Sequence, residues 1–512
     1  MVFDSDRRTR VPSLLFSVCV VLWLGARTNS SEAADASRPN ILFILSDDQR
    51  WDALGAENNT AIQTPNLDAL AKSGVLFRQA SVVVSLCCPS RAALLTGLLP
   101  HQSGYYSNKM WTIDAGNGFT QPTAVELLRR SGYHTCLVGK WHIKPAPWRC
   151  GFDEVRMWMP HGADKYVNAE LAHGKSEKIN ETPGHVSDLF TTDAVAFLKD
   201  QARSGAQQPF FMWLAYTEPH SPMKPVPERC CEPYKTLSAE HTPPGFPPDE
   251  RAGDSWAKYY SAITHLDEQC GIVLKTLAES GLADNTVVVY LSDNGWLMGS
   301  HGYYGKMVPM EESVRVPLII KAPPALQKWT GISDALVAST DLTATWLAIA
   351  GVTVPPDCPG ESMLPLLASP APKPAFRDDL FCEFEDEITA PGYAFRSIRT
   401  QDWKYILRPH RAGKAFKKME EKFEEAAEEK RTHKAPVMDE EQLFDLKNDP
   451  FEFHDLIHDP AAKEALRIMR LRLEGWMRRT DDPALDSNFP VWTLRIPKDV
   501  ERRSGNDDKQ KD

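Results

Sequence analysis

Residues 286–295, TVVVYLSDNG, join a short apolar run to a polar turn, and this combination decides the fold class. The run Thr286–Leu291 is rich in valine and does not alternate with polar residues, which is typical of a strand buried on both faces of a sheet. Amphipathic segments that end near a glycine, such as Thr123–Arg130 and Ser255–Ser280, have the pattern of helices. This alternation predicts an α/β fold, with a doubly wound, largely parallel sheet flanked by helices. The other predicted strands are Ile41–Leu45, Thr135–Val138, Phe210–Ala215 and Val316–Ile320.

The pattern changes after residues 362–376, a proline-rich segment that we interpret as a linker. Beyond it, the short runs Tyr393–Ile398 and Trp403–Leu407 and a helical pattern near Ala461–Met477 predict a smaller C-terminal α+β subdomain, an antiparallel sheet plus a helix. We therefore expect a large domain at residues 37–375, a subdomain at 376–490 and a tail at 491–512. The charged segment Lys414–Arg431 between the predicted elements is expected to be a solvated helix or a flexible insertion.

The N-terminal 36 residues have the pattern of a secretory signal peptide. Arg7, Arg8 and Arg10 precede an apolar run, Leu14–Ala26, and small residues then lead to Ala34-Asp35-Ala36. About 13 apolar residues are too few to span a bilayer, which takes roughly 20. We expect residues 1–36 to be removed and the protein to be exported, to a periplasm or out of the cell, with no membrane span.

The charge of the chain limits its partners. The 512 residues include 58 basic and 69 acidic side chains, a formal net charge of −11. An acidic surface argues against nucleic acid as a partner. An anionic substrate would need a locally positive pocket on this acidic body.

Polar side chains follow four of the predicted strands at the point where each strand ends. Because ligands bind outside the carboxyl ends of strands in open α/β sheets, these side chains are expected to meet at one edge. Any one of them alone could be a turn or cap residue, but four strand ends together are hard to explain in that way. They are Ser46-Asp47-Asp48, Gly139-Lys140-Trp141-His142, Glu218-Pro219-His220 and Ser292-Asp293-Asn294.

Four of these side chains, those of Asp47, Asp48, Asp293 and Asn294, offer only oxygen as a ligand. Hard cations such as Ca²⁺ take six to eight oxygen ligands, and carboxylates with one amide carbonyl suit them better than they suit zinc. Three clustered carboxylates without a cation would also cost several kcal/mol through repulsion and desolvation. The sequence therefore predicts a calcium site.

A second feature is CCPSRAALLTG, residues 87–97. Pro89 followed by an apolar helical pattern suggests a helix with proline at its first position, which would place Cys87 at the positive end of the helix dipole. Two interpretations are open at this point, a buried thiol at a helix start or a nucleophile beside an anion site.

The segment from Cys87 to Gly97 matches C-x-P-S-R-x-x-x-L-T-G without a gap, and it resembles the signature of the type I sulfatase family, in the alkaline-phosphatase-like superfamily. The SDDQ, GKWH, EPH and SDNG segments match that family in order, as does the HG…K segment from His301 to Lys306. The resemblance runs from about Asn40 to Pro323 and resumes at Leu443–Glu452. The CCPSR form is similar to that of N-acetylglucosamine-6-sulfatases, although only at one permissive position.

This resemblance implies a sulfuric ester hydrolase, with its catalytic domain at residues 37–375, that removes sulfate from a sulfated saccharide. Cys87 would be oxidised by a maturation enzyme to Cα-formylglycine, an aldehyde whose hydrate attacks sulfur with one hydroxyl and expels sulfate with the other. One Ca²⁺ would be bound by Asp47, Asp48, Asp293, Asn294 and the modified Cys87. The catalytic residues would be Cys87, with Arg91 and Lys140 orienting it, His142 as the base, His220 as the acid for the leaving alcohol, and Lys306 beside the sulfate.

Two other functions remain open on the sequence. A phosphonate or phosphodiester hydrolase of the same superfamily could use the same groups, and a catalytically silent sulfatase-like protein could bind carbohydrate. Lys306 could also be a surface lysine, and Cys88 a packing residue or a disulfide partner. Substrate selectivity is expected to come from the loops Tyr105–Thr112 and Pro160–Tyr166 and from the C-terminal subdomain near Arg399 and Trp403.

Overall fold

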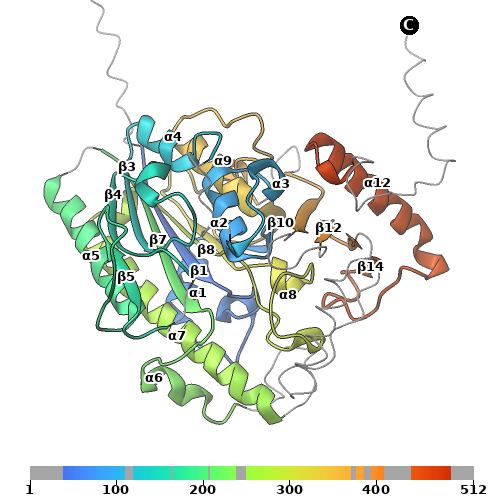
Figure 1. The fold of residues 1–512 in the computed structure, drawn as a ribbon, viewed down its shortest axis with the longest axis horizontal. Helices are drawn as coiled ribbons and strands as arrows, with labels where there is room; N and C mark the ends of the chain where they lie inside the picture. Colours follow the sequence, from blue (N-terminus) through green and yellow to red (C-terminus); the bar gives the residue numbers. More distant parts are fainter. Residues whose placement is uncertain are drawn as a thin grey trace, which may run out of the picture. The chain divides into compact units, whose positions relative to one another are not determined.

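A mixed ten-stranded sheet dominates the part of the chain that the computed structural model describes (Figure 1). Its strand order is β10-β2-β9-β8-β1-β7-β3-β4-β5-β6. The central strands β8, β1, β7, β3 and β4 are parallel, whereas β9 runs antiparallel to both of its neighbours. The strands are β1 Asn40–Asp47, β2 Val75–Ser81, β3 His134–Lys140, β4 Glu154–Met159, β5 Glu170–His173, β6 Ile179–Glu181, β7 Phe210–Pro219, β8 Thr286–Ser292, β9 Leu318–Lys321 and β10 Gly331–Ala338.

The described residues are 38–109, 119–162, 165–205, 208–237, 250–370, 376–385, 394–408 and 440–485. The predicted signal peptide, the charged segment Lys414–Arg431 and the predicted tail lie outside them. The predicted domain boundaries at residues 375 and 490 also lie outside them and stay predictions. Within the described residues, no helix has the length and apolarity needed to cross a membrane.

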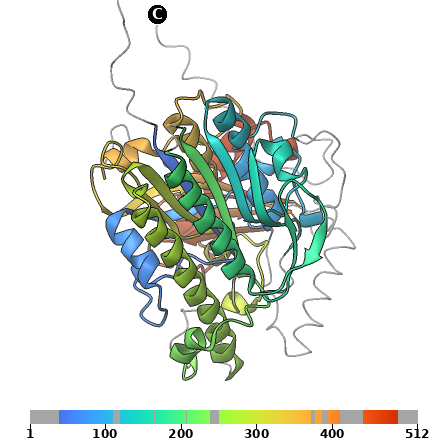
Figure 2. The same cartoon turned by 90° about the vertical axis from the view of Figure 1, so that its left-hand side faces the viewer.

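Helices cover both faces of the sheet, so the predicted doubly wound α/β fold is confirmed. Helices α1, α5 and α7 pack on one face, and α2, α4 and α9 on the other (Figures 1 and 2). The helices of this large unit are α1 Pro65–Ser73, α2 Cys87–Thr96, α3 Pro100–Ser103, α4 Ala124–Arg130, α5 Val186–Ser204, α6 Glu228–Cys231, α7 Glu250–Glu279, α8 Glu311–Val314, α9 Ser339–Ile349 and α10 Leu364–Ala368.

Strand β1 shows why the central strands lack an alternating pattern. Ile41, Phe43 and Leu45 belong to the core beneath α2 and α9, whereas Leu42 and Ile44 belong to the core beneath α5 and α7. Both faces of the strand are therefore buried, and apolar side chains are required at every position.

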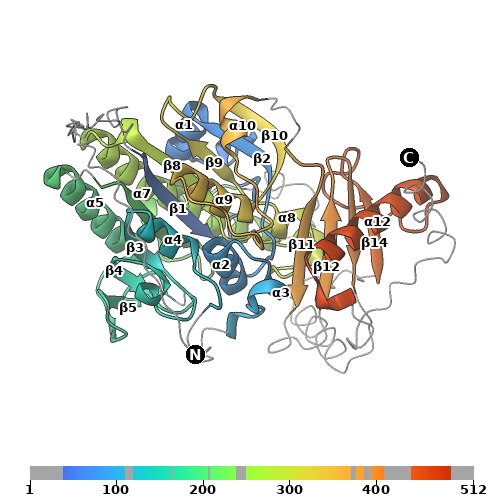
Figure 3. The same ribbon diagram turned by 90° about the horizontal axis from the view of Figure 1, so that it is seen from above.

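A second, four-stranded antiparallel sheet lies at the C-terminal end, in the order β11-β12-β13-β14, with α12 Lys463–Arg479 packed against it (Figure 3). This confirms the predicted α+β subdomain. Its strands are β11 Leu380–Glu385, β12 Ala394–Arg399, β13 Trp403–Leu407 and β14 Glu441–Asp445.

The interpretation of residues 362–376 as a linker is wrong for their first part. Residues 364–368 form α10, and Leu366 and Leu367 are buried in the main core. The two leucines bury apolar surface that a free linker would expose, while Pro365 lies at the start of the helix, where no backbone N–H is needed.

Candidate active site

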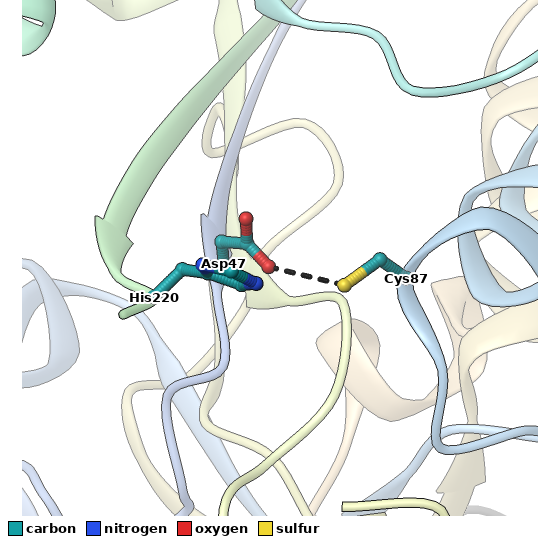
Figure 4. Close-up of side chains that lie close together, drawn as sticks. All are labelled: Asp47, Cys87 and His220. Carbon is teal, nitrogen blue, oxygen red and sulfur yellow. Dashed lines mark hydrogen bonds between the residues drawn. The ribbon is translucent and has the colours of Figure 1, made fainter. Parts of the chain in front are cut away.

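The carboxyl ends of the central strands meet at one edge of the sheet, as the sequence predicts. Asp47 ends β1, Lys140 ends β3, and Asp293 directly follows β8. The parallel register aligns these ends, because Ser46 pairs with Ser292 and Asp47 with Pro219. Helix α2 brings Cys87 to the same edge from another part of the chain, and Figure 4 shows its thiol facing Asp47, with the His220 ring beside that carboxylate.

Cys87 is the first residue of α2, and Leu86 is the residue that caps it. The expectation that Pro89 occupies the first helical position is wrong, because the Ser90 N–H already donates to the Leu86 carbonyl and Pro89 is therefore third. The prediction that Cys87 lies at the positive end of the helix dipole is unaffected.

The Cys87 thiol is fully buried among charged groups. Its Sγ lies 3.4 Å from Asp47 Oδ1 and accepts a hydrogen bond of 2.7 Å from Lys306 Nζ. Burial, reinforced by the negative charge of Asp47, raises the pKa of the thiol well above its usual value. As an unmodified cysteine, this residue is therefore a poor nucleophile, because the thiolate is the reactive form.

Each carboxylate of the site is paired with its own cation. Asp47 accepts a very short hydrogen bond from Lys140, Asp48 Oδ1 lies 2.5 Å from Lys306 Nζ, and Asp293 Oδ2 lies 2.8 Å from Arg91 Nε. All six side chains are buried. Three negative and three positive charges balance, so these side-chain cations already offset much of the repulsion expected between three clustered carboxylates.

Two buried oxygen atoms provide a better indication of a cation site. Asp48 Oδ2 and Asn294 Oδ1 have no hydrogen-bond partner among the described residues. Ligand atoms of Asp47, Asp48, Cys87 and Asp293 lie within 4.8 Å of one another. Buried oxygens without partners are costly, and a hard cation would satisfy both. The donor set therefore fits Ca²⁺.

Asp47 and Asp293 differ in the balance between burial and charge. Burial raises the pKa of both carboxyls, but for Asp47 the Lys140 ammonium and other cations outweigh it and hold the pKa well below the usual range. The pKa of Asp293 rises to about 6, because the neighbouring Asp47 charge adds to the effect of burial. Burial lowers the pKa of Lys140, but the neighbouring negative charges, of which Asp47 contributes most, together outweigh it and raise the pKa, so the ammonium stays charged.

The two predicted acid–base histidines are both neutral; His142 is buried, whereas the His220 side chain is 22% exposed. Burial and the Lys140 charge lower the pKa of His142 well below its usual value, and His142 Nδ1 has no hydrogen-bond partner among the described residues. Burial also lowers the pKa of His220. His220 Nδ1 donates to the Ser221 carbonyl at 2.7 Å, and its Nε2 faces Asp48 Oδ2 at 3.7 Å.

The structure decides two smaller questions. Lys306 is buried beside Cys87 and is not a surface lysine. Cys88 is a packing residue whose thiol donates to the His142 carbonyl at 2.7 Å, and the described cysteines form no disulfide. Arg399 is a buried residue that contacts Glu311 at 3.2 Å, and the selectivity expected of the subdomain near it stays a prediction.

Sequence reasoning missed Trp296 as a neighbour of the site. Its ring lies 6.3 Å from the ring of His220 and 5.6 Å from Lys306 Nζ. The signal available in the sequence was its position two residues after Asn294, shortly after the end of strand β8. His301, at the start of the HG…K segment, has a positive φ and pairs with the buried Glu312 at 3.3 Å.

Comparisons with known proteins find similarity to sulfatases over most of the chain. The N-acetylglucosamine-6-O-sulfatase of Bacteroides thetaiotaomicron is 28% identical, and the match covers 92% of each chain. An ulvan-active sulfatase of Formosa agariphila is 29% identical over 83% of this chain and 78% of its own length. A structure solved with its substrate D-glucosamine-2-N,6-O-disulfate has 25% identity and a TM-score of 0.70, and the match covers 87% of this chain and 98% of the other.

Three further findings concern the fold and the family. A phosphonate monoester hydrolase of Agrobacterium radiobacter, 22% identical, shares the fold with a TM-score of 0.65 over 86% of this chain and 96% of its own. A family model described as N-sulphoglucosamine sulphohydrolase, C-terminal, matches residues 299–424. The sulfatase family model matches residues 39–352, which hold every predicted site residue from Asp47 to Lys306. With more than half of its length matched in this way, the chain belongs to the sulfatase family.

Proposed function

We propose that this protein is an exported hydrolase that removes a sulfate group from a sulfated saccharide. The observation that carries the proposal is the buried position of Cys87 at the start of α2, in contact with Lys306 and Asp47. Similar proteins named for N-acetylglucosamine 6-O-sulfate and for ulvan support a saccharide as the substrate class.

Cys87 is proposed to act as Cα-formylglycine, so that its Sγ marks the place of a hydroxyl of the aldehyde hydrate. The modification supplies a nucleophile that a buried thiol with a raised pKa does not provide. Arg91 and Lys140 supply positive charge around this position, Arg91 beside Asp293 and Lys140 beside Asp47. Arg91 bridges Asp293 and the Lys140 carbonyl at 2.8 and 2.7 Å, which fixes both strand ends against α2.

Asp47, Asp48, Asp293 and Asn294 are proposed to hold one Ca²⁺, with the modified Cys87 as a further ligand. When bound, the ion supplies Lewis-acid polarisation of a sulfate oxygen. Because the protein charges of the site already balance, two added positive charges make the pocket attractive to an anionic ester. This resolves how an acidic protein would bind a sulfate.

The proton transfers are assigned to the two histidines. Neutral His142 is suited to accept a proton, since burial and Lys140 keep its pKa low. His220 already donates from Nδ1 to Ser221, so it can protonate the leaving oxygen only from Nε2 in its doubly protonated form. A bound sulfate anion would favour that form. Lys306 remains a cation for sulfate oxygens, because the carboxylates around it, Asp48 above all, together outweigh its burial and raise its pKa.

A paired assay separates this proposal from a phosphodiesterase. We expect the matured, calcium-loaded protein to hydrolyse 4-nitrophenyl sulfate much faster than bis(4-nitrophenyl) phosphate, and the Cys87→Ala variant to hydrolyse neither. A screen of defined sulfated mono- and disaccharides then identifies the sugar, with glucosamine 6-O-sulfate as the first choice. Preference for the phosphodiester would contradict the proposal, and saccharide binding without turnover of any ester would indicate a silent binding protein.

Export is tested separately. Residues 1–36 are proposed to be removed, so N-terminal sequencing of the mature protein from its native host should begin at Ser37. Protein that accumulates in the cytoplasm with residue 1 or 2 intact would contradict export.

A further inference from the structure

A buried cluster of charged and aromatic side chains lies behind His220, outside the set of residues assigned above. It consists of Glu218, His265, His185, Tyr166 and Ser187, and we call it the Glu218 cluster. These residues come from β7, α7, the start of α5 and the segment before α5. Glu218 is fully buried and lies two residues before His220 in the chain.

Glu218 and His265 form a buried ion pair. Glu218 Oε1 lies 3.3 Å from His265 Nδ1, and Glu218 Oε2 accepts a very short hydrogen bond from Ser187 Oγ. Burial lowers the pKa of His265, but the hydrogen bond and the charge of Glu218, together with the charges of Asp188 and Glu268, outweigh it and raise the pKa above its usual value. His265 Nε2 also faces Asp188 Oδ1 at 3.3 Å, so both ring nitrogens have an acidic partner.

The same cluster holds the backbone on the other side of His220. The Tyr166 hydroxyl donates to the His220 carbonyl at 2.6 Å, and His185 Nε2 donates to the Pro225 carbonyl at 3.1 Å. The His185 ring packs at 4.5 Å from that of His265 and at 5.6 Å from that of Tyr166. The segment from Glu218 to Pro225 is thus attached to the cluster at three points.

His220 depends on this attachment for its direction. Its own Nδ1 donates to the next carbonyl, that of Ser221, so the ring follows the local backbone. Only its Nε2 faces the site, 3.7 Å from Asp48 Oδ2. A displacement of about 1 Å at a reacting group can cost about 100-fold in rate. Small shifts of this backbone would therefore change what Nε2 can reach.

We infer that Glu218 and His265 are positioning residues for His220, and that their buried ion pair serves proton transfer to the leaving alcohol. The position of this pair distinguishes it from other buried pairs, because Glu218 lies two residues before His220 and its cluster holds the His220 carbonyl through Tyr166. The inference rests on the proposed function, because it needs a leaving group that His220 protonates.

The test compares two aryl sulfates that differ in how much their leaving group needs a proton. Phenolate is a poor leaving group and 4-nitrophenolate a good one, so loss of general-acid catalysis slows phenyl sulfate selectively. We expect Glu218→Gln and His265→Gln to lower kcat/KM for phenyl sulfate about 10- to 100-fold more than for 4-nitrophenyl sulfate. His220→Ala should show the same selectivity, at least as strongly.

Tyr166→Phe provides a milder variant in case the ion-pair variants do not fold. It removes only the hydroxyl that donates to the His220 carbonyl. We expect kcat/KM for phenyl sulfate again to fall more than that for 4-nitrophenyl sulfate, by a smaller factor than in the ion-pair variants. Glu383→Gln is the matched control, because Glu383 forms a comparably buried pair with His101 Nδ1 at 2.7 Å, between α3 and β11. It should change both substrates equally.

The outcomes separate the two proposals. A wild-type protein that hydrolyses neither ester contradicts the proposed function, and this inference with it. An active wild type whose Glu218, His265 and Tyr166 variants lose equal factors on both esters contradicts this inference alone. Selectivity in those variants and its absence in Glu383→Gln supports it.

Discussion

Replacing Asp48 by asparagine removes one charge from the proposed calcium site without disturbing the backbone. Asp48 has a φ of 69°, in the left-handed region that aspartate and asparagine both tolerate. Its Oδ1 pairs with Lys306 Nζ at 2.5 Å, and its Oδ2 is one of the two oxygens in the proposed ligand set that have no hydrogen-bond partner among the described residues. The variant therefore weakens an ion pair and a ligand set at once.

The two effects have different sizes and can be measured separately. Without calcium, Asp48→Asn leaves the buried Lys306 with less negative charge around it, which should lower the free energy of unfolding by about 3 kcal/mol. Calcium at about 100 times its Kd should stabilise the wild type by about 2.7 kcal/mol. A ten-fold loss of affinity reduces this gain to about 1.4 kcal/mol at the same concentration.

Urea denaturation with calcium and with a chelator measures both quantities. Asp52→Asn is the control, because it makes the same chemical change four residues away in an ion pair with Arg50, apart from the calcium ligands. It should retain the full gain from calcium. An Asp48→Asn protein that gains as much from calcium as the wild type would refute the assignment of Asp48 as a ligand.

Three further predictions concern single residues. His142→Ala should release up to about one equivalent of alcohol and then stall, because His142 is assigned to the second half of the reaction, and steady turnover would show that another group is the base. Asp293 is expected to help deprotonate the attacking hydroxyl of the aldehyde hydrate as well as to bind the ion. Excess calcium should therefore not restore activity in Asp293→Asn, whereas it should partly restore Asp48→Asn; equal recovery at saturation would make Asp293 a ligand only. Burial lowers the pKa of His101, but Glu383 outweighs it and raises the pKa above 6.5. The His101–Glu383 pair therefore contributes its full stabilisation below pH 6.5, and this contribution is lost as the pH rises through the folded pKa of His101. In urea denaturation over this pH range, the wild type should show that loss and His101→Gln should not.

The position of the site could be predicted from the sequence because the signal is local. Asp47, Lys140 and Asp293 each stand at or directly after an apolar run, and parallel strands bring such residues to one edge. The register of β1 with β7 and β8 does this here. The fold class followed from the same runs.

The pairing of side chains across that edge could not be predicted. Asp48 pairs with Lys306, 258 residues away, and Asp293 with Arg91, 202 residues away. The sequence around each of these residues does not indicate which cation pairs with which carboxylate, so the charge balance of the site could not be predicted. For the same reason Trp296 was missed, since it is a neighbour of His220 and Lys306 only in space.

Residues 362–376 show a different limit. Their prolines indicate a linker, but packing decided the structure, because Leu366 and Leu367 bury their side chains in the main core. Proline content indicates which conformations the backbone can adopt. The stabilisation from burying two leucines depends instead on an apolar surface formed by residues distant in the sequence.

The central claim is that Cys87 carries the nucleophile as Cα-formylglycine. Mass analysis of the peptide that contains Cys87, taken from active protein produced in its native host, tests this most directly. Conversion of the thiol to the aldehyde should give a loss of about 18 Da at that residue, and specific activity should rise in proportion to the converted fraction. Protein that hydrolyses sulfate esters at full rate while Cys87 remains an unmodified thiol would contradict the account.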